Sequence, residues 1–149
     1  MNILVSSNKS PIFTADIPVR WCDLDPIGHV NNAVYMTYLE EARVQFGKKI
    51  GLGFDPCMVP VIVSSENHYR LPIKWPAHLH IQLFIQRLGR TSATFGHRII
   101  DAVNSEKLYC EGHVITVWFN SIKGKPTEVP SQLKELVKEE PPMDPVESR

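Results

Sequence analysis

The stretch RWCDLDPIGHVNNAVYMTYLEEARVQFGKKI, Arg20 to Ile50, decides how the chain folds, because a dense polar turn runs directly into a helical pattern. Five apolar side chains recur there at spacings of four and three, which places them on one stripe of an α-helix with Tyr38 at its margin. These five are Tyr35, Leu39, Ala42, Phe46 and Ile50. The other side of the helix carries Thr37, Glu40, Glu41, Val44 and Lys48. The pattern predicts one amphipathic helix of about 18 residues, capped by Asn31 or Asn32 and ending at the glycines of IGLGFDP.

Segments typical of β-strands lie on both sides of this helix. IFTADIPVRW precedes the helix, and four more segments follow it: VPVIVSSENHYRL, HLHIQLFIQRL, TSATFGHRIID and KLYCEGHVITVWFN. Apolar and polar residues alternate in HLHIQLFIQRL with the period of two that a half-buried strand requires. The order of strand, helix and four further strands predicts an α+β fold, in which a five-stranded antiparallel sheet packs against one long helix. Because the edges of such a sheet are open to pairing with another copy, we expect a homodimer.

The length of 149 residues fits one domain. We expect residues 1–11 to form an N-terminal extension and residues 12–138 to form the domain, closed by a short helix in SQLKELVKEE. Residues 139–149, which contain PPMDPVESR, are expected to form a disordered tail.

Composition argues against several classes of partner. Sixteen basic and sixteen acidic side chains cancel, and aromatic residues are not interleaved with a basic stripe, so we expect no nucleic-acid partner. The three cysteines are far apart and lack metal-site spacing, which predicts free thiols and no metal site. The start MNILVSSNKS does not read as a secretory signal, and no segment is apolar enough to span a membrane. We therefore expect a soluble cytoplasmic protein that does not associate with membranes.

The polar junction before the helix has two interpretations. In the first it is only a turn, in which the Asp25 side chain bonds the backbone two residues on, Pro26 fixes φ, and Gly28 adopts positive φ. In the second, Asp25 lies close to the helix N-terminus, where unpaired N–H groups point outward. A carboxylate beside such donors can attack an acyl carbonyl or deprotonate a water, and a thioester suits this chemistry because a thiolate leaves easily. The bend and the cap account for the other residues, so Asp25 is expected to have no structural role that requires it.

The segment VRWCDLDPIGHVNNAVYMTYLEEAR, Val19 to Arg43, resembles the signature of the 4-hydroxybenzoyl-CoA thioesterase-like branch of the hot-dog superfamily. The later segments RLP, RLGRTSATF and VWFNSIKGKPTEVP fit the same family. The resemblance implies the hot-dog fold, in which the sheet wraps around the helix. It also implies hydrolysis of an acyl-CoA to a free acid and coenzyme A, in dimers that often pair into tetramers. No separate cofactor is implied, because coenzyme A is part of the substrate.

Site residues follow from the same resemblance. Asp25 corresponds to the essential acid, as nucleophile or general base, and a backbone N–H near Asn31 and Asn32 corresponds to the oxyanion donor. His29 and Asn31 are expected to line the site. Further substrate contacts are expected from Gly28, Tyr35, Arg87, Arg90, Thr91, Ser92, Lys123 and Lys125, of which the basic residues would bind the phosphates of coenzyme A. Solvation at the surface is the competing interpretation of those basic residues.

Other polar and aromatic residues receive weaker assignments. Glu40 could be the helix acid that another branch of these thioesterases uses, although we favour a solvated residue facing Arg43. Asp23 is assigned to the turn. The remaining histidines, His68, His78, His80, His97 and His113, are assigned to packing or to the surface, and Trp21, Trp75 and Trp118 to the core or to dimer contacts.

Two alternative functions remain open. A hydratase or dehydratase acting on an acyl thioester would need an acid and a histidine at one substrate carbon, such as His29 with Asp25 or Glu40. A non-catalytic module would bind acyl-CoA or a protein partner without turnover. Release of free thiol distinguishes hydrolysis from both alternatives.

Overall fold

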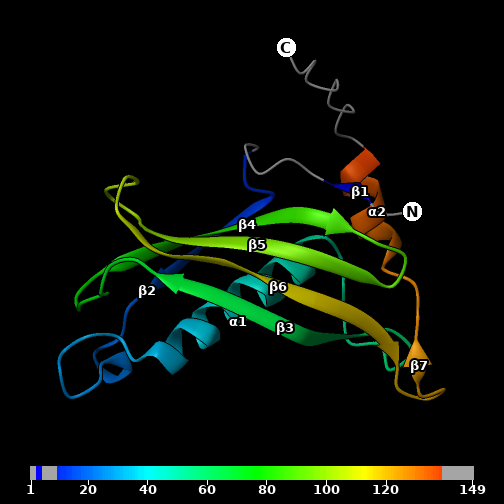
Figure 1. The fold of residues 1–149 in the computed structure, drawn as a ribbon, viewed down its shortest axis with the longest axis horizontal. Helices are drawn as coiled ribbons and strands as arrows, with labels where there is room; N and C mark the ends of the chain where they lie inside the picture. Colours follow the sequence, from blue (N-terminus) through cyan, green and yellow to red (C-terminus); the bar gives the residue numbers. More distant parts are fainter. Residues whose placement is uncertain (1–2, 5–9, 139–149) are drawn as a thin grey trace, which may run out of the picture.

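A computed structural model describes residues 3–4 and 10–138 (Figure 1). The predicted tail and most of the N-terminal extension lie outside the described residues. The elements in chain order are β1 (Ile3–Leu4), β2 (Phe13–Pro18), the 3-10 turn η1 (Trp21–Asp23), α1 (Asn32–Lys49), β3 (Val59–Tyr69), β4 (His78–Leu88), β5 (Ser92–Asp101), β6 (Leu108–Asn120), β7 (Lys125–Pro126) and α2 (Ser131–Lys138).

Helix α1 forms where the apolar spacing predicts it. Asn31 is the N-cap, and its Oδ1 accepts a hydrogen bond from the Ala33 N–H at 2.9 Å. Gly51 ends the helix with a φ of 84°, a conformation that glycine adopts without steric cost. The predicted stripe is buried except for Ile50, which is half-buried, and the five residues predicted on the opposite side are exposed.

The sheet is antiparallel and curves over α1 (Figure 1). Strands β4, β5, β6 and β3 are neighbours in that order, and the other side of β4 pairs with β2 and, further along, with β1. The predicted α+β fold is therefore confirmed, because the main strands wrap one long helix. The sequence did not predict a strand in the N-terminal extension, yet Ile3 and Leu4 pair with Leu88 and Arg87.

The core lies between α1 and the concave face of the sheet. Along β4, Leu79, Ile81, Leu83 and Ile85 are buried while the residues between them are less so, as the alternation predicts. The Phe46 ring of α1 meets Phe95 of β5 edge to face, with ring centroids 6.3 Å apart. Burying apolar area of this kind provides the main driving force for folding. In the described part of the chain, no helix has the length and apolar character to cross a membrane.

Strand β3 is an open edge of the sheet. It pairs with β6 on one side only, and nine of its eleven residues are exposed. Val61, Ile62 and Val63 expose 42%, 42% and 59% of their surface. A long apolar edge strand is a template for pairing with another strand, so β3 is the part of this fold best suited to contact a partner.

A polar pair, of which His97 is buried and Asn67 is half-buried, links β5 to β3. His97 is buried, and its Nε2 lies 2.7 Å from Oδ1 of Asn67. Gly112 of β6 is paired with both residues and carries no side chain between them. Burial, and then the positive charges of Arg43 and His113, lowers the pKa of His97 from its ordinary 6.5 to about 4. The imidazole is therefore neutral in the folded protein at pH 7.

We expect this neutral imidazole to make stability depend on pH. Between pH 6.5 and about 4 the unfolded chain takes up a proton that buried His97 does not, so the free energy of unfolding falls as pH falls, by up to about 3 kcal/mol. His97→Gln keeps a donor for Asn67 and should flatten this fall, measured by urea denaturation at several pH values. The control is His68→Gln, which removes an exposed imidazole. An unchanged pH profile in His97→Gln would contradict the assignment.

Candidate active site

The junction before α1 is a closed loop. Leu24 and Val30 form an isolated antiparallel bridge, and inside it the Asp25 N–H donates to the His29 carbonyl at 2.8 Å. The Gly28 N–H donates to the Asp25 carbonyl at 3.0 Å, with Gly28 at a φ of 80°. The predicted turn is thus present, with the positive φ where the glycine stands.

Asp25 helps to hold this loop, in contrast to the expectation that it has no structural role. Its Oδ1 accepts hydrogen bonds from the N–H groups of Ile27 at 3.0 Å and His29 at 3.4 Å. A short acidic side chain stabilises its own turn in this way, so the sequence motif serves structure as well. Oδ2 accepts no hydrogen bond from the described residues, and the side chain is half-buried. The loop therefore fixes the orientation of the carboxylate and leaves one oxygen for a reactant.

The first turn of α1 offers one unpaired backbone donor. The Asn31 N–H donates to the Asp23 carbonyl at 3.0 Å, and the Val34 N–H donates to the Asn31 carbonyl at 2.9 Å. The Ala33 N–H is used by the cap. Among the described residues the Asn32 N–H has no hydrogen-bond partner. Of Asn31 and Asn32, the two positions predicted to supply the oxyanion donor, only Asn32 therefore has a backbone N–H left for a substrate oxygen. The positive end of the helix dipole favours negative charge at this point.

Asp23, two residues before Asp25, has a different environment. The side chain of Asp23 is 2% exposed. Its Oδ2 accepts hydrogen bonds from the Tyr38 hydroxyl at 2.6 Å and from the Arg20 backbone N–H at 2.9 Å. Its Oδ1 accepts a hydrogen bond from the Arg20 guanidinium at 2.9 Å. Burial alone would raise the pKa of Asp23, but these hydrogen bonds and the Arg20 charge hold it below its ordinary value. The assignment of Asp23 to the turn is correct but incomplete. Asp23 also contacts Tyr38, which lies on α1 fifteen residues further along the chain. No local signal in the sequence indicates that contact.

Tyr38→Phe should weaken this anchor without changing the charge of Asp23. The buried carboxylate would lose one donor, which costs about 1–3 kcal/mol of unfolding free energy. Since the anchor holds the loop that carries Asp25, the variant should also lose catalytic activity. Chemical denaturation and a thioester hydrolysis assay measure the two effects. Tyr69→Phe, at a tyrosine half exposed on β3, is the control; equal stability of the two variants would contradict the anchor.

The other residues predicted near the acid lie at the same end of the molecule. His29 is half-buried in the loop. Tyr35 is buried on α1 and meets Tyr69 edge to face at 4.9 Å between ring centroids, so within one protomer it packs in the core. Glu40 is exposed, as expected of a solvated residue. Burial lowers the pKa of Arg43, and the negative charge of Glu40 partly offsets this, as expected if Glu40 faces Arg43.

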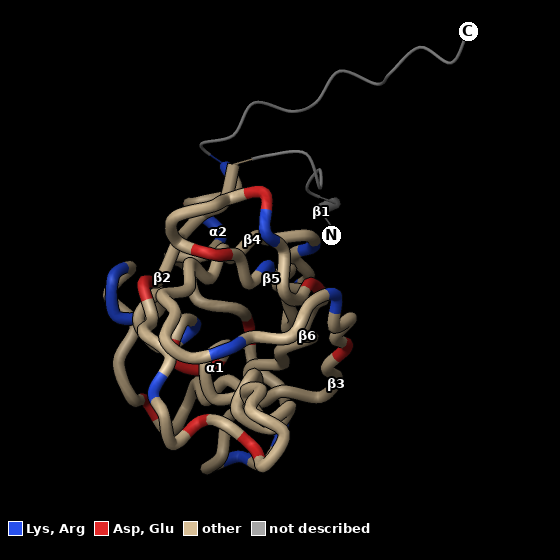
Figure 2. Tube along the Cα trace, turned by 90° about the vertical axis from the view of Figure 1, so that its left-hand side faces the viewer, with Lys and Arg blue, Asp and Glu red and all other residues tan. Residues whose placement is uncertain are grey.

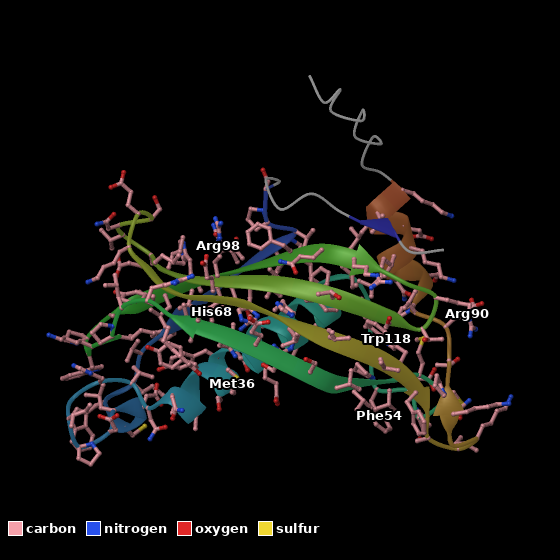
Figure 3. The ribbon with its side chains drawn as sticks, viewed as in Figure 1. Met36, Phe54, His68, Arg90, Arg98 and Trp118 are labelled. Atoms are coloured by element: carbon pink, nitrogen blue, oxygen red, sulfur yellow. The ribbon has the colours of Figure 1, made fainter. Side chains whose placement is uncertain are left out.

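The predicted phosphate-binding residues lie at the opposite end of the chain's fold. Arg90, Thr91 and Ser92 belong to the β4–β5 hairpin, and Lys123 and Lys125 to the connection from β6 to β7 (Figure 1). Figure 3 shows Arg90 far along the sheet from Met36, which stands on the first half of α1. Helix α1 alone spans about 27 Å between the two ends. The fold of a single chain therefore does not bring Arg87, Arg90 or the two lysines close to Asp25.

Comparison with known proteins agrees with the fold and with the junction motif. A solved structure of the PA2801 protein from Pseudomonas aeruginosa superposes with a TM-score of 0.81 at 36% identity, covering 85% of this chain and 98% of that one. The acyl-acyl carrier protein thioesterase ATL3 of Arabidopsis thaliana is 28% identical over 84% of this chain and 67% of its own length. The acyl-CoA thioester hydrolase YbgC of Escherichia coli O6:H1 is 26% identical, over 84% and 95%.

The family model of the thioesterase-like superfamily matches residues 19–137, a span that begins at the polar junction and includes α1 and strands β3 to β7. The hot-dog architecture and the family inferred from the junction motif are both confirmed. The chain belongs to the thioesterase-like superfamily.

Proposed function

We propose that this protein is an acyl-CoA thioesterase that hydrolyses the thioester to a free carboxylic acid and coenzyme A. The observation that supports this most directly is the pairing of a fixed carboxylate with an unpaired amide. Asp25 keeps Oδ2 available in a loop that leads into α1, and the Asn32 N–H is unpaired in the described chain at the start of that helix. Among its relatives, YbgC is named for acyl-CoA substrates and ATL3 for acyl carrier protein thioesters.

Each group has a defined role in the proposed reaction. The thioester carbonyl oxygen accepts a hydrogen bond from the Asn32 N–H, which stabilises negative charge as the tetrahedral intermediate forms. In one route Asp25 attacks the carbonyl carbon, the carbon–sulfur bond breaks to release the coenzyme A thiolate, and a water hydrolyses the resulting anhydride to the free acid and the Asp25 carboxylate. In the other route Asp25 removes a proton from a water that attacks the carbonyl carbon, and the carbon–sulfur bond then breaks. In both routes the thiolate leaves as the thiol after taking up the proton that the water loses. In a single turnover in labelled water, label in the Asp25 carboxylate would indicate the covalent route.

Asp25→Asn is the sharpest test of this chemistry. Asparagine keeps an oxygen that can accept from the Ile27 and His29 N–H groups, so the loop should persist while the charge is lost. We expect kcat to fall by about 10²- to 10⁴-fold, with folding and coenzyme A binding unchanged. Thiol release from short, long and aromatic acyl-CoAs, followed with a thiol-trapping dye, measures this. Asp55→Asn is a matched control, because Asp55 Oδ1 likewise accepts from the N–H two residues on, that of Cys57.

Near-normal hydrolysis by Asp25→Asn would contradict the proposed role of the acid. Conversion of an acyl thioester without thiol release would favour the hydratase or dehydratase alternative. Saturable binding of acyl-CoA by the wild-type protein without turnover would favour a non-catalytic module.

We further propose that the enzyme is a homodimer built on β3. A twofold axis through this open edge would pair two β3 strands antiparallel, so that the Tyr69 end of one strand lies beside the Val59 end of the other. The Asp25 loop lies near the Tyr69 end, since the Val30 N–H donates to the Ile73 carbonyl at 2.8 Å. The partner's β3 would then form a wall of the site. Pairing of two such dimers into a tetramer stays a prediction.

This arrangement also bears on the predicted phosphate contacts. The Val59 end of β3 pairs with Phe119, next to the connection that carries Lys123 and Lys125. The partner's basic residues would therefore approach Asp25 from the other protomer. Contacts of Arg87, Arg90, Thr91, Ser92 and the two lysines with coenzyme A stay a prediction that requires the dimer.

Charges placed on this edge should separate the protomers. The double variant Val61→Lys and Val63→Lys puts two positive charges on β3 that would face their symmetry mates. We expect a shift from dimer to monomer in sedimentation velocity, together with loss of thioesterase activity. Val44→Lys, at a valine 63% exposed on the outer side of α1, is the control. A variant that stays dimeric and active would contradict the interface.

A further inference from the structure

A hollow of about 620 Å³ lies at the end of the molecule that carries Asp25. Two segments form it: the β3–β4 connection on one side and the β5–β6 hairpin with the strand ends beside it on the other. Figure 2 faces this end of the molecule, where basic and acidic residues are interspersed along the chain. The volume falls within the range of small-molecule binding sites in proteins. The proposed chemistry at Asp25 makes no use of this hollow.

Two lysine side chains line the hollow. Lys74 and Lys107 line it, both are exposed, and neither forms an ion pair within the described parts of the chain. Lys107 Nζ lies 5.4 Å from the centroid of the Tyr109 ring, and its positive charge helps to lower the pKa of Asp101, so its side chain stays beside these two lining residues. Two lysines facing one space attract an anion that carries more than one negative charge.

The one carboxylate in the lining is already satisfied. Asp101 Oδ1 accepts from the N–H groups of Val103 and Asn104, both at 2.9 Å, and Oδ2 accepts from the Tyr109 hydroxyl at 3.0 Å. His78 also lines the hollow, and its Nδ1 lies 3.7 Å from Asp16. The lysines therefore outnumber the lining carboxylate two to one, and that carboxylate is bonded to the hairpin.

The hollow and the Asp25 loop share one segment of backbone. Leu71, Lys74 and Ala77 of the β3–β4 connection line the hollow. Ile73 of the same connection accepts from Val30 of the Asp25 loop, and the Ala77 carbonyl accepts from the Val19 N–H at 2.9 Å. A ligand with one end at Asp25 and the other in the hollow would therefore cross a single connection within one protomer.

We propose that the Lys74–Lys107 hollow binds the phosphate-bearing nucleotide end of the acyl-CoA whose thioester is cleaved at Asp25 of the same protomer. This rests on the proposed function. Acyl-CoA fits because it joins a thioester to several phosphate groups through a flexible chain. Lysine ammonium groups provide point charges for such phosphates, and the apolar side chains of Leu71 and Val103 offer contact area for the base.

The test compares two pairs of lysines. We expect the double variant Lys74→Ala and Lys107→Ala to raise KM for acyl-CoA by about tenfold with kcat unchanged, because each charge-assisted contact contributes modestly. Hydrolysis of the matching acyl thioester of N-acetylcysteamine, which has no nucleotide, should not change. Calorimetry should show that adenosine 3′,5′-bisphosphate binds the wild-type protein and binds this variant at least about tenfold more weakly. The variant Lys74→Arg and Lys107→Arg should restore binding.

The matched control is Lys48→Ala with Lys138→Ala, which removes the same number of charges from two exposed lysines that neither line the hollow nor belong to the predicted coenzyme A contacts. Unchanged nucleotide binding in the Lys74 and Lys107 variant would overturn the inference, as would absence of nucleotide binding by the wild-type protein. Equal loss of binding in the Lys48 and Lys138 control would overturn it too, because the effect would then follow net charge and not this hollow. If the nucleotide binds as expected but no acyl-CoA is hydrolysed, the proposed function fails while the nucleotide site stands.

Discussion

The buried carboxylate of Asp23 is the constraint on which the site depends. It bonds the Arg20 backbone and guanidinium before the loop and the Tyr38 hydroxyl on the second turn of α1. An ionised group at 2% exposure is costly unless donors satisfy it, and here three do. Because the same group holds the end of β2 and the helix, the chain between them has little freedom to move. The loop with Asp25 and the unpaired Asn32 amide lies within that closed span.

Two aspartates separated by one residue thus have opposite roles because of their surroundings. Asp23 has both oxygens bonded and is buried, so it is unavailable to a substrate. Asp25 bonds the backbone through Oδ1 alone and is half-buried. The hydrogen bonds that hold its turn also aim the second oxygen, since a carboxylate is planar and rotates as one unit. Structure and the proposed chemistry therefore use different oxygens of one side chain.

The sequence predicted those features that depend on local pattern. The period of α1, its Asn31 cap, the turn at Gly28 and the alternation of β4 follow from neighbours a few residues apart, and each is confirmed. The contact from Tyr38 to Asp23 and the pair of His97 with Asn67 join residues on different elements, so no spacing rule indicates them. The pairing of Ile3 and Leu4 with β4 was missed for the same reason. The basic residues chosen by resemblance lie at the far end from Asp25, which the sequence did not indicate because a family motif gives positions along the chain and not distances in the fold.

In the proposed homodimer, the two ends of the fold would divide the tasks of binding and specificity between protomers. The hollow with Lys74 and Lys107 and the Asp25 loop belong to one chain and share the β3–β4 connection. If both proposals hold, affinity for the nucleotide end and the chemical step would be properties of a single protomer. In the proposed dimer, antiparallel pairing would place the Val59 end of the partner's β3 beside the Asp25 loop. The exposed apolar residues near that end of β3, and Phe54 before it at 90% exposure, would therefore reach the site only from the partner. The choice of acyl group would therefore be set across the interface, and changes in β3 would alter acyl preference without altering how coenzyme A is held.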